Sequence, residues 1–252
     1  MARFVLVHGA FCGAWIWKPL IERLRTKDHS VEAFDLPGLG EDHTPVSEIT
    51  LDACADRLCE VLASNPEPAI VVGHSMGGII ATHGAARCRE RIAALVYVTA
   101  FLPKDGQSLL DLTKLPEGAG DQVQANILIE GEPPVAVMPA AASRHALYDF
   151  CAEHVAAWAI ERQRPQPVAP FVTPVSIPPG ALDNINRYYV LCTRDRAMMP
   201  ALQRRMVAEN PCKEVVELST DHTPQLSMTE ELAEVLRRFA ALISPARKLD
   251  KI

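Results

Sequence analysis

Short apolar runs alternate along the chain with stretches whose apolar residues recur every three or four positions. Apolar runs bounded by turn residues are typical of buried strands, and the wider spacing is typical of amphipathic helices. The runs predict strands over Phe4–His8, Val31–Asp35, Ala69–Val72, Ala94–Val98, Tyr188–Thr193 and Glu214–Leu218. The wider spacing predicts helices over Trp15–Leu24, Leu51–Leu62, Met76–Arg87, Pro200–Glu209 and Glu230–Ile243.

This alternation predicts an α/β fold, in which a mostly parallel, doubly wound sheet carries helices on both faces. The alternation breaks between residues 102 and 186, where Pro and Gly are frequent and only Ala140–Phe150 and Ala152–Arg162 have helical spacing. A long insertion between two strands of a sheet is usually functional. We therefore expect one domain over residues 1–252, with an inserted cap over residues 102–186.

Composition narrows the possible partners. The chain has 252 residues, of which 48% are hydrophobic and 22% charged, with a net charge of −6. These values are ordinary for a globular protein, and the absence of a basic run argues against nucleic-acid binding. No apolar stretch approaches the roughly 20 residues that span a bilayer, so we expect no membrane segment. The charged tail Arg247–Lys251 is expected to be a solvated end.

The cysteines and histidines indicate neither a disulfide framework nor a metal site. The seven Cys are scattered, and no two have the CxxC spacing. The eight His include no HExxH motif. This pattern favours reduced thiols and a cytoplasmic location, and we expect no structural or catalytic metal.

The motif that carries chemistry is Gly73-His74-Ser75-Met76-Gly77, a G-x-S-x-G sequence. It follows the predicted strand Ala69–Val72 and leads into a helix rich in small residues. A strand, a tight turn and a helix in this order form a nucleophile elbow, which exposes a serine at the carboxyl end of the strand. Ser75 is therefore the candidate nucleophile. The alternative is a glycine-rich connector with an incidental serine.

A serine hydroxyl needs a general base, and in this fold the chain order is serine, acid, histidine. His222 follows the last predicted strand and is the candidate base. Asp195 follows the strand before it and is the candidate acid, which would fix the histidine tautomer. Asp221 is adjacent to His222, so its side chain is expected to point away. A surface-loop histidine and a loop-capping aspartate are the alternatives.

Acyl transfer also needs two donors for the developing oxyanion. One is the backbone N–H of Met76, directly after the nucleophile, and the other is expected from Ala10 after the first strand. We expect a small to medium, mostly apolar pocket. Its candidate lining residues, each of which could instead be plain core, are Gly9, Phe11, Phe101, Leu147, Trp158, Met198 and Thr223.

Four segments together resemble the plant methyl-esterase and hydroxynitrile-lyase family of the α/β-hydrolase fold. They are the opening Phe4–Trp17, the elbow Gly73–Gly78, the acid loop Cys192–Ala197 and the histidine loop Asp221–Ser227. The resemblance covers about residues 3–100 and 188–243 and is weak in the cap. It implies Ser75, Asp195 and His222 as a catalytic triad, and Ala10 and Met76 as oxyanion donors. No cofactor is implied, because acyl transfer on such a triad needs none. The resemblance makes a homodimer plausible.

Two departures within the family favour its esterase branch. Gly9 stands where the lyases have Thr, and Thr223 stands where they have a Lys that supplies charge for the leaving cyanide. We therefore expect a serine hydrolase of the carboxylesterase type that cleaves a small to medium, largely apolar ester as its small-molecule substrate. An amidase, carbamate hydrolase or lactonase on the same triad remains open. A hydroxynitrile lyase and a non-catalytic ligand receptor are further alternatives.

Overall fold

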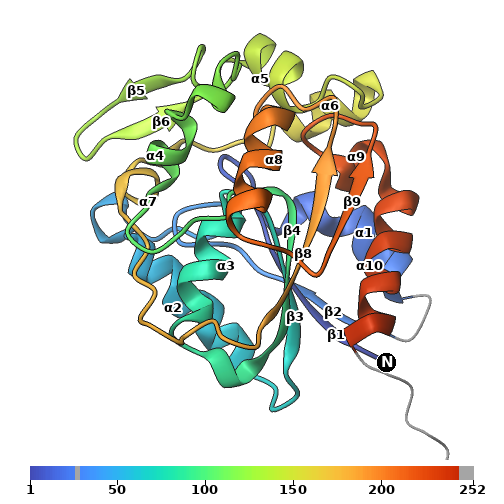
Figure 1. Ribbon diagram of the computed structural model, residues 1–252. Coiled ribbons are helices and arrows are strands. Elements are labelled where there is room, and N and C mark those ends of the chain that lie inside the picture. The colour runs from blue at the N-terminus through green and yellow to red at the C-terminus, as the bar shows by residue number, and fades with distance from the viewer. Residues whose placement is uncertain (26–28, 244–252) are drawn as a thin grey trace, which may run out of the picture.

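A computed structural model describes residues 1–25 and 29–243 (Figure 1). Its centre is a six-stranded sheet in the order β2-β1-β3-β4-β8-β9, in which every neighbouring pair is parallel. The strands are β1 (Arg3–Val7), β2 (Ser30–Ala33), β3 (Ala69–Ser75), β4 (Ile92–Ala100), β8 (Asn186–Cys192) and β9 (Glu214–Leu218). The parallel sheet predicted from the alternating pattern is thus present, and both ends of the chain contribute strands to it.

Helices cover both faces of the sheet because side chains alternate across each strand. On one face, Phe4 of β1 packs in a cluster with Leu20 and Phe239. On the other face, Val5 packs in a cluster with Leu58. The first face is covered by α1 (Lys18–Arg25) and α10 (Thr229–Ile243), and the second by α2 (Leu51–Ala63), α3 (Gly77–Ala85) and α8 (Pro200–Glu209) (Figure 1).

The segment between β4 and β8, residues 101–185, is called the inserted segment below. It overlaps the cap predicted over residues 102–186 and contains short elements only. Its antiparallel sheet has the order β5-β6-β7 and projects at the upper left of Figure 1. The elements are α4 (Leu109–Thr113), β5 (Leu128–Glu130), β6 (Val135–Val137), α5 (Ala140–Leu147), α6 (Glu153–Ile160), β7 (Gln166–Pro167) and α7 (Ala169–Val172).

Several boundaries differ from the sequence prediction. The helix expected over Trp15–Leu24 is a 3₁₀ turn followed by α1, and the helix expected to reach Phe150 ends at Leu147. The small sheet was not predicted, because its strands are two or three residues long and every residue of β5 is exposed, so no alternation marks them. The remaining short helices are η1 (Ala14–Trp17), η2 (Val46–Glu48), η3 (Arg89–Arg91), η4 (Pro116–Gly118) and α9 (Pro224–Ser227).

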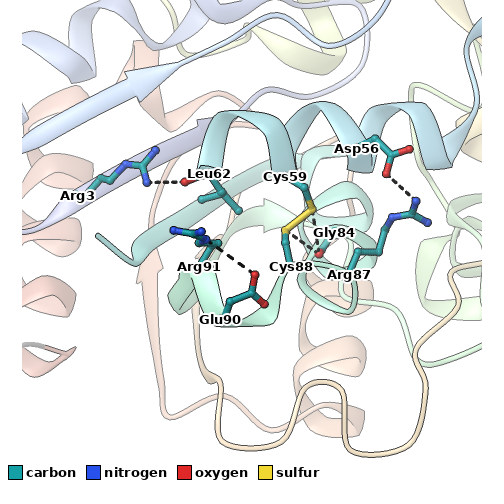
Figure 2. The surroundings of a disulfide bond; sticks show 9 residues. All are labelled: Arg3, Asp56, Cys59, Leu62, Gly84, Arg87, Cys88, Glu90 and Arg91. Atoms are coloured by element: carbon teal, nitrogen blue, oxygen red, sulfur yellow. Dashed lines mark hydrogen bonds and ion pairs between the residues drawn. A yellow bond between two sulfur atoms is a disulfide. The ribbon is translucent and has the colours of Figure 1, made fainter. Parts of the chain in front are cut away.

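The expectation that all cysteines are reduced thiols is wrong for one pair. Cys59 of α2 and Cys88, just after α3, form a disulfide (Figure 2). The two residues are 29 positions apart and meet only because α2 packs against α3, which spacing in the sequence does not reveal. This bond removes part of the reason for expecting a cytoplasmic location.

Two other expectations concern the ends and the helices of the chain. The predicted solvated tail, residues 247–251, lies outside the described residues. Over residues 1–25 and 29–243, no helix has the length and apolar character needed to cross a membrane.

Candidate active site

Ser75 is the last residue of β3, and Met76 alone separates it from α3. Its φ of 53° is in the left-handed region, which a non-glycine residue rarely occupies without a functional reason. The turn is so tight that a Cβ on Gly77 would lie 2.5 Å from the Val7 carbonyl oxygen, and one on Gly73 would lie 2.6 Å from the Gly77 oxygen. The two motif glycines therefore allow the turn, and the turn puts Ser75 at the carboxyl edge of the sheet.

His222 and Asp195 are in direct contact. The His222 Nδ1–H donates to Asp195 Oδ2 at 2.7 Å, and both residues are buried. Burial lowers the pKa of His222, but the charge and the hydrogen bond of Asp195, together with the charges of Asp221 and Asp121, raise this pKa above its ordinary value. The bond leaves Nε2 of the neutral ring unprotonated, which is the form that can accept a proton.

Asp195 is held on both carboxylate oxygens. Oδ1 accepts from the backbone N–H groups of Ala197 and Met198 at 2.7 and 2.8 Å. Oδ2 accepts from the Thr99 hydroxyl and, at 3.4 Å, from Gln203 Nε2. These donors keep the carboxylate oriented toward His222. The role of Thr99 was missed, because it lies in β4 and approaches Asp195 only in the folded chain.

Two other buried histidines support the site. The Nε2–H of His74 donates to the His222 carbonyl at 2.7 Å, and burial lowers the pKa of His74 well below its ordinary value. His8 has a pKa lowered to about 4 by burial, and its Nε2 accepts from the Leu36 N–H at 3.1 Å. Both rings are therefore neutral near pH 7, and each has a backbone hydrogen-bond partner.

The two candidate oxyanion donors lie beside Ser75. Ala10 and Met76 both line the same cavity as Ser75 and His222. Among the described residues, no backbone carbonyl accepts from either N–H. Ser75 Oγ likewise has no protein partner within the described chain, and catalytic hydrogen bonds often tighten only when substrate is bound. The candidate nucleophile, the candidate base and the residues of two unused donors thus line one cavity.

This cavity has a volume of about 40 Å³, which is enough for a few water-sized groups, and it is partly open to solvent. Phe11, Phe101, Leu147 and Thr223 line it, as predicted from the sequence. The complete lining is Ala10, Phe11, Cys12, His74, Ser75, Met76, Phe101, Leu109, Thr113, Asp121, Val123, Gln124, Leu147, Tyr148, Phe171, Ala197, His222 and Thr223.

Three residues predicted to line the pocket lie elsewhere. Gly9 packs so closely behind Ser75 that an added Cβ would approach the Ser75 Cβ to 2.9 Å. Trp158 of α6 packs edge-on against Trp15, with ring centroids 5.2 Å apart, and lines a separate shallow groove. Met198 is fully buried behind the acid loop, so its side chain belongs to the core.

Sequence reasoning missed most of the cavity wall that the inserted segment supplies. Leu109, Thr113 and Phe171 come from its short helices, Asp121 from the loop after η4, and Tyr148 from the end of α5. No motif marks these positions, because the inserted segment is irregular and its register relative to the sheet is a tertiary property. Within the described chain, no group of three or more His, Cys, Asp or Glu is arranged to hold a metal ion.

Comparison with known proteins gives a consistent assignment. The model of the alpha/beta hydrolase family matches residues 4–235. Methylesterase 7 of Arabidopsis thaliana is 31% identical over 94% of this chain and 96% of its own length. Putative methylesterase 14, chloroplastic, of the same plant is 30% identical over 95% of this chain and 72% of its own. The crystal structure of polyneuridine aldehyde esterase superposes with a TM-score of 0.86 at 25% identity, over 95% of this chain and 99% of that one.

Proposed function

Because the chain belongs to the methylesterase family of α/β-hydrolases, we propose that it is a serine carboxylesterase acting on a small to medium, largely apolar ester. The observation that carries this proposal is the 2.7 Å contact from His222 Nδ1 to Asp195 Oδ2, in a histidine that lines the same cavity as Ser75. The relatives named as methylesterases and as an esterase support the same bond type.

In the proposed mechanism, Ser75 Oγ attacks the ester carbonyl while His222 Nε2 takes its proton. Asp195 stabilises the imidazolium that forms. The N–H groups of Ala10 and Met76 donate to the oxyanion, where preorganised donors contribute most in a water-poor cavity. His222 then protonates the leaving alcohol, the acyl group stays on Ser75, and water activated by His222 releases the acid.

Cyanohydrin cleavage on the same framework is disfavoured. It needs a cation close to the leaving cyanide, and the cavity lining in the described chain includes neither Lys nor Arg. The residue after the base, Thr223, is engaged elsewhere, because its hydroxyl donates to the Leu147 carbonyl at 2.8 Å. Ester hydrolysis needs no such cation. Amide, carbamate and lactone substrates share the acyl-transfer chemistry and are separated by direct comparison of turnover.

The test is labelling with a fluorophosphonate, read by intact mass, together with hydrolysis of p-nitrophenyl acetate, butyrate and octanoate. One adduct and measurable turnover are expected for the wild type, and neither for Ser75→Ala. The variant should fold normally, since Ser75 Oγ has no protein partner among the described residues. Undiminished turnover by folded Ser75→Ala protein, or an unlabelled and inactive wild type, contradicts the proposal.

A further inference from the structure

The catalytic cavity contains one carboxylate that the proposed mechanism does not use. Asp121, in the loop after η4, lines the cavity and is only 8% exposed. Apart from the base His222 itself, the lining residues of the described chain include no group that carries a positive charge. Asp121 is therefore a buried acid that faces an otherwise mostly apolar enclosure.

Only half of the Asp121 carboxylate has a structural role. Oδ1 accepts from the N–H groups of Val123 and Gln124 at 2.7 and 3.1 Å, which closes the turn over residues 121–124. Oδ2 accepts no hydrogen bond from any residue in the described part of the chain. A turn cap requires a single oxygen, and Asn or Ser would supply it. The second oxygen is thus available to a molecule in the cavity.

The environment makes that second oxygen a strong acceptor. Burial raises the pKa of Asp121 to about 6, while its two backbone N–H partners and the nearby His222 oppose the rise. The carboxyl is then mostly ionised at pH 7.5. Oδ2 is not among the atoms of the described residues that are sealed from solvent without a partner, so it can be reached from the cavity, and a ligand that donates a hydrogen bond would satisfy it. An ionised carboxylate cannot donate, so an acceptor group on the ligand would not serve.

Asp121 does not compete with the catalytic acid. The Nδ1–H of His222 already donates to Asp195, and no hydrogen bond joins Asp121 to His222 among the described contacts. The influence of Asp121 on His222 is limited to a small contribution through its charge. The position of Asp121 therefore suits substrate selection rather than proton transfer.

We propose that Asp121 is a specificity-determining residue that selects esters whose acyl part carries a hydroxyl or a protonated amine. This inference rests on the proposed esterase function of the same cavity. The hydrogen-bond donor of the substrate would pair with Asp121 Oδ2, while the rest of the substrate packs against apolar walls such as Phe101 and Leu147.

The experiment compares matched methyl esters at pH 7.5, with methanol release as the readout. A short set consists of methyl butanoate, methyl 3-hydroxypropanoate and methyl 3-aminopropanoate, which differ only in a terminal CH3, OH or NH3⁺. A longer set consists of methyl phenylacetates with ethyl, hydroxymethyl or aminomethyl at the meta or para position. Each ester is assayed with wild type, Asp121→Asn and Asp121→Ser. Glu130→Gln, an exposed carboxylate change in β5, is the matched control.

Asp121→Asn keeps an oxygen for the turn and replaces the free acceptor with an NH2 donor. The quantity compared is the ratio of kcat/KM for the ester with a terminal OH or NH3⁺ to kcat/KM for the ester with a terminal CH3. In at least one set, this ratio should be on the order of tenfold lower for Asp121→Asn than for the wild type, as for a lost hydrogen bond to a charged group. Because the same two esters are compared in both proteins, their intrinsic reactivities cancel when the ratio for the variant is divided by the ratio for the wild type. Asp121→Ser should show the same loss, and Glu130→Gln should not.

The outcomes separate the two proposals. If the wild type hydrolyses the esters but the ratio is unchanged in both Asp121 variants, the role of Asp121 is refuted while the esterase function stands. If a donor preference survives in folded Asp121→Asn and Asp121→Ser, another residue makes the contact and the inference is equally wrong. If the wild type hydrolyses no ester and is not labelled at Ser75, the proposed function itself fails.

Discussion

Replacing Asp195 by Asn tests the proposed catalytic geometry most directly. The change is nearly isosteric, and removes one negative charge while turning one acceptor oxygen into a donor. In the wild type, Oδ1 accepts from two backbone N–H groups and Oδ2 accepts from His222 Nδ1–H and the Thr99 hydroxyl. An Asn side chain has one acceptor oxygen, so it satisfies only one of these two sets.

The contacts decide which set is satisfied. The backbone N–H groups of Ala197 and Met198 cannot change from donor to acceptor. The imidazole of His222 changes role by moving its proton to Nε2, and the hydroxyl of Thr99 rotates. The amide oxygen should therefore remain on the backbone side, and its NH2 should donate to His222 Nδ1. His222 would then carry its proton on Nε2, the atom that must accept the proton of Ser75.

The wrong tautomer of His222 and the loss of the Asp195 charge together predict a fall in kcat on the order of 10⁴-fold, the scale of the corresponding change in other triads. The destabilisation should be modest, about 1–3 kcal/mol, because no buried backbone donor is left without a partner. Hydrolysis of p-nitrophenyl butyrate, the rate of fluorophosphonate labelling and a thermal melt measure these effects. Asp56→Asn, an exposed carboxylate of α2 that pairs with Arg87, is the control and should retain full activity (Figure 2).

Asp195→Asn protein that folds and keeps activity within tenfold of the wild type would refute the reasoning, since the base would then work without its acid. Equal losses in Asp195→Asn and Asp56→Asn would also contradict it, because a general effect of charge removal would explain both. A large loss confined to Asp195→Asn is the expected result.

Two further predictions follow from the structure. Opening the Cys59–Cys88 bond, by reduction or by replacing both residues with Ala, should lower the free energy of unfolding by about 3.6 kcal/mol, from the loop entropy for 29 residues. The melting temperature should fall by about 7 °C, without loss of activity at 25 °C. An unchanged Tm contradicts this prediction, and so does a further fall in Tm when reductant is added to the Ala variant. Because the base must be neutral, kcat/KM should fall as pH drops through the His222 pKa, which Asp195 holds above 6.5; a rate that stays flat to pH 5 argues against His222 as base.

The fold was predictable because its sheet is marked by local pattern. Apolar runs such as Ile70–Val72 are long enough to identify buried strands, and their alternation with helices specifies a parallel arrangement. Chain order then brings Asp195 and His222 to one sheet edge, since each follows a strand at its carboxyl end. These inferences depend only on periodicity and on the geometry of parallel sheets.

The remainder depends on tertiary proximity that no local pattern encodes. Thr99 belongs to a buried strand, and its sequence context predicts an ordinary core residue. Only the folded structure shows that its hydroxyl donates to Asp195. Cys59 and Cys88 are bonded because two helices pack, and Asp121 lies in an irregular loop whose position relative to Ser75 is set by packing. Trp158 failed as a predicted pocket residue for the same reason, since composition does not reveal that α6 packs away from the cavity.

The inserted segment does more than cover the cavity, because it is hydrogen-bonded to the histidine loop. The Phe150 N–H donates to Asp221 Oδ2 at 2.8 Å, next to the base, and the Thr223 hydroxyl on its other side donates to the Leu147 carbonyl at 2.8 Å. The neighbours of His222 on both sides are therefore anchored to the segment that also supplies much of the cavity wall. Substitutions that reshape this wall near α5 should alter kcat as well as KM, because specificity and the position of the base depend on the same contacts.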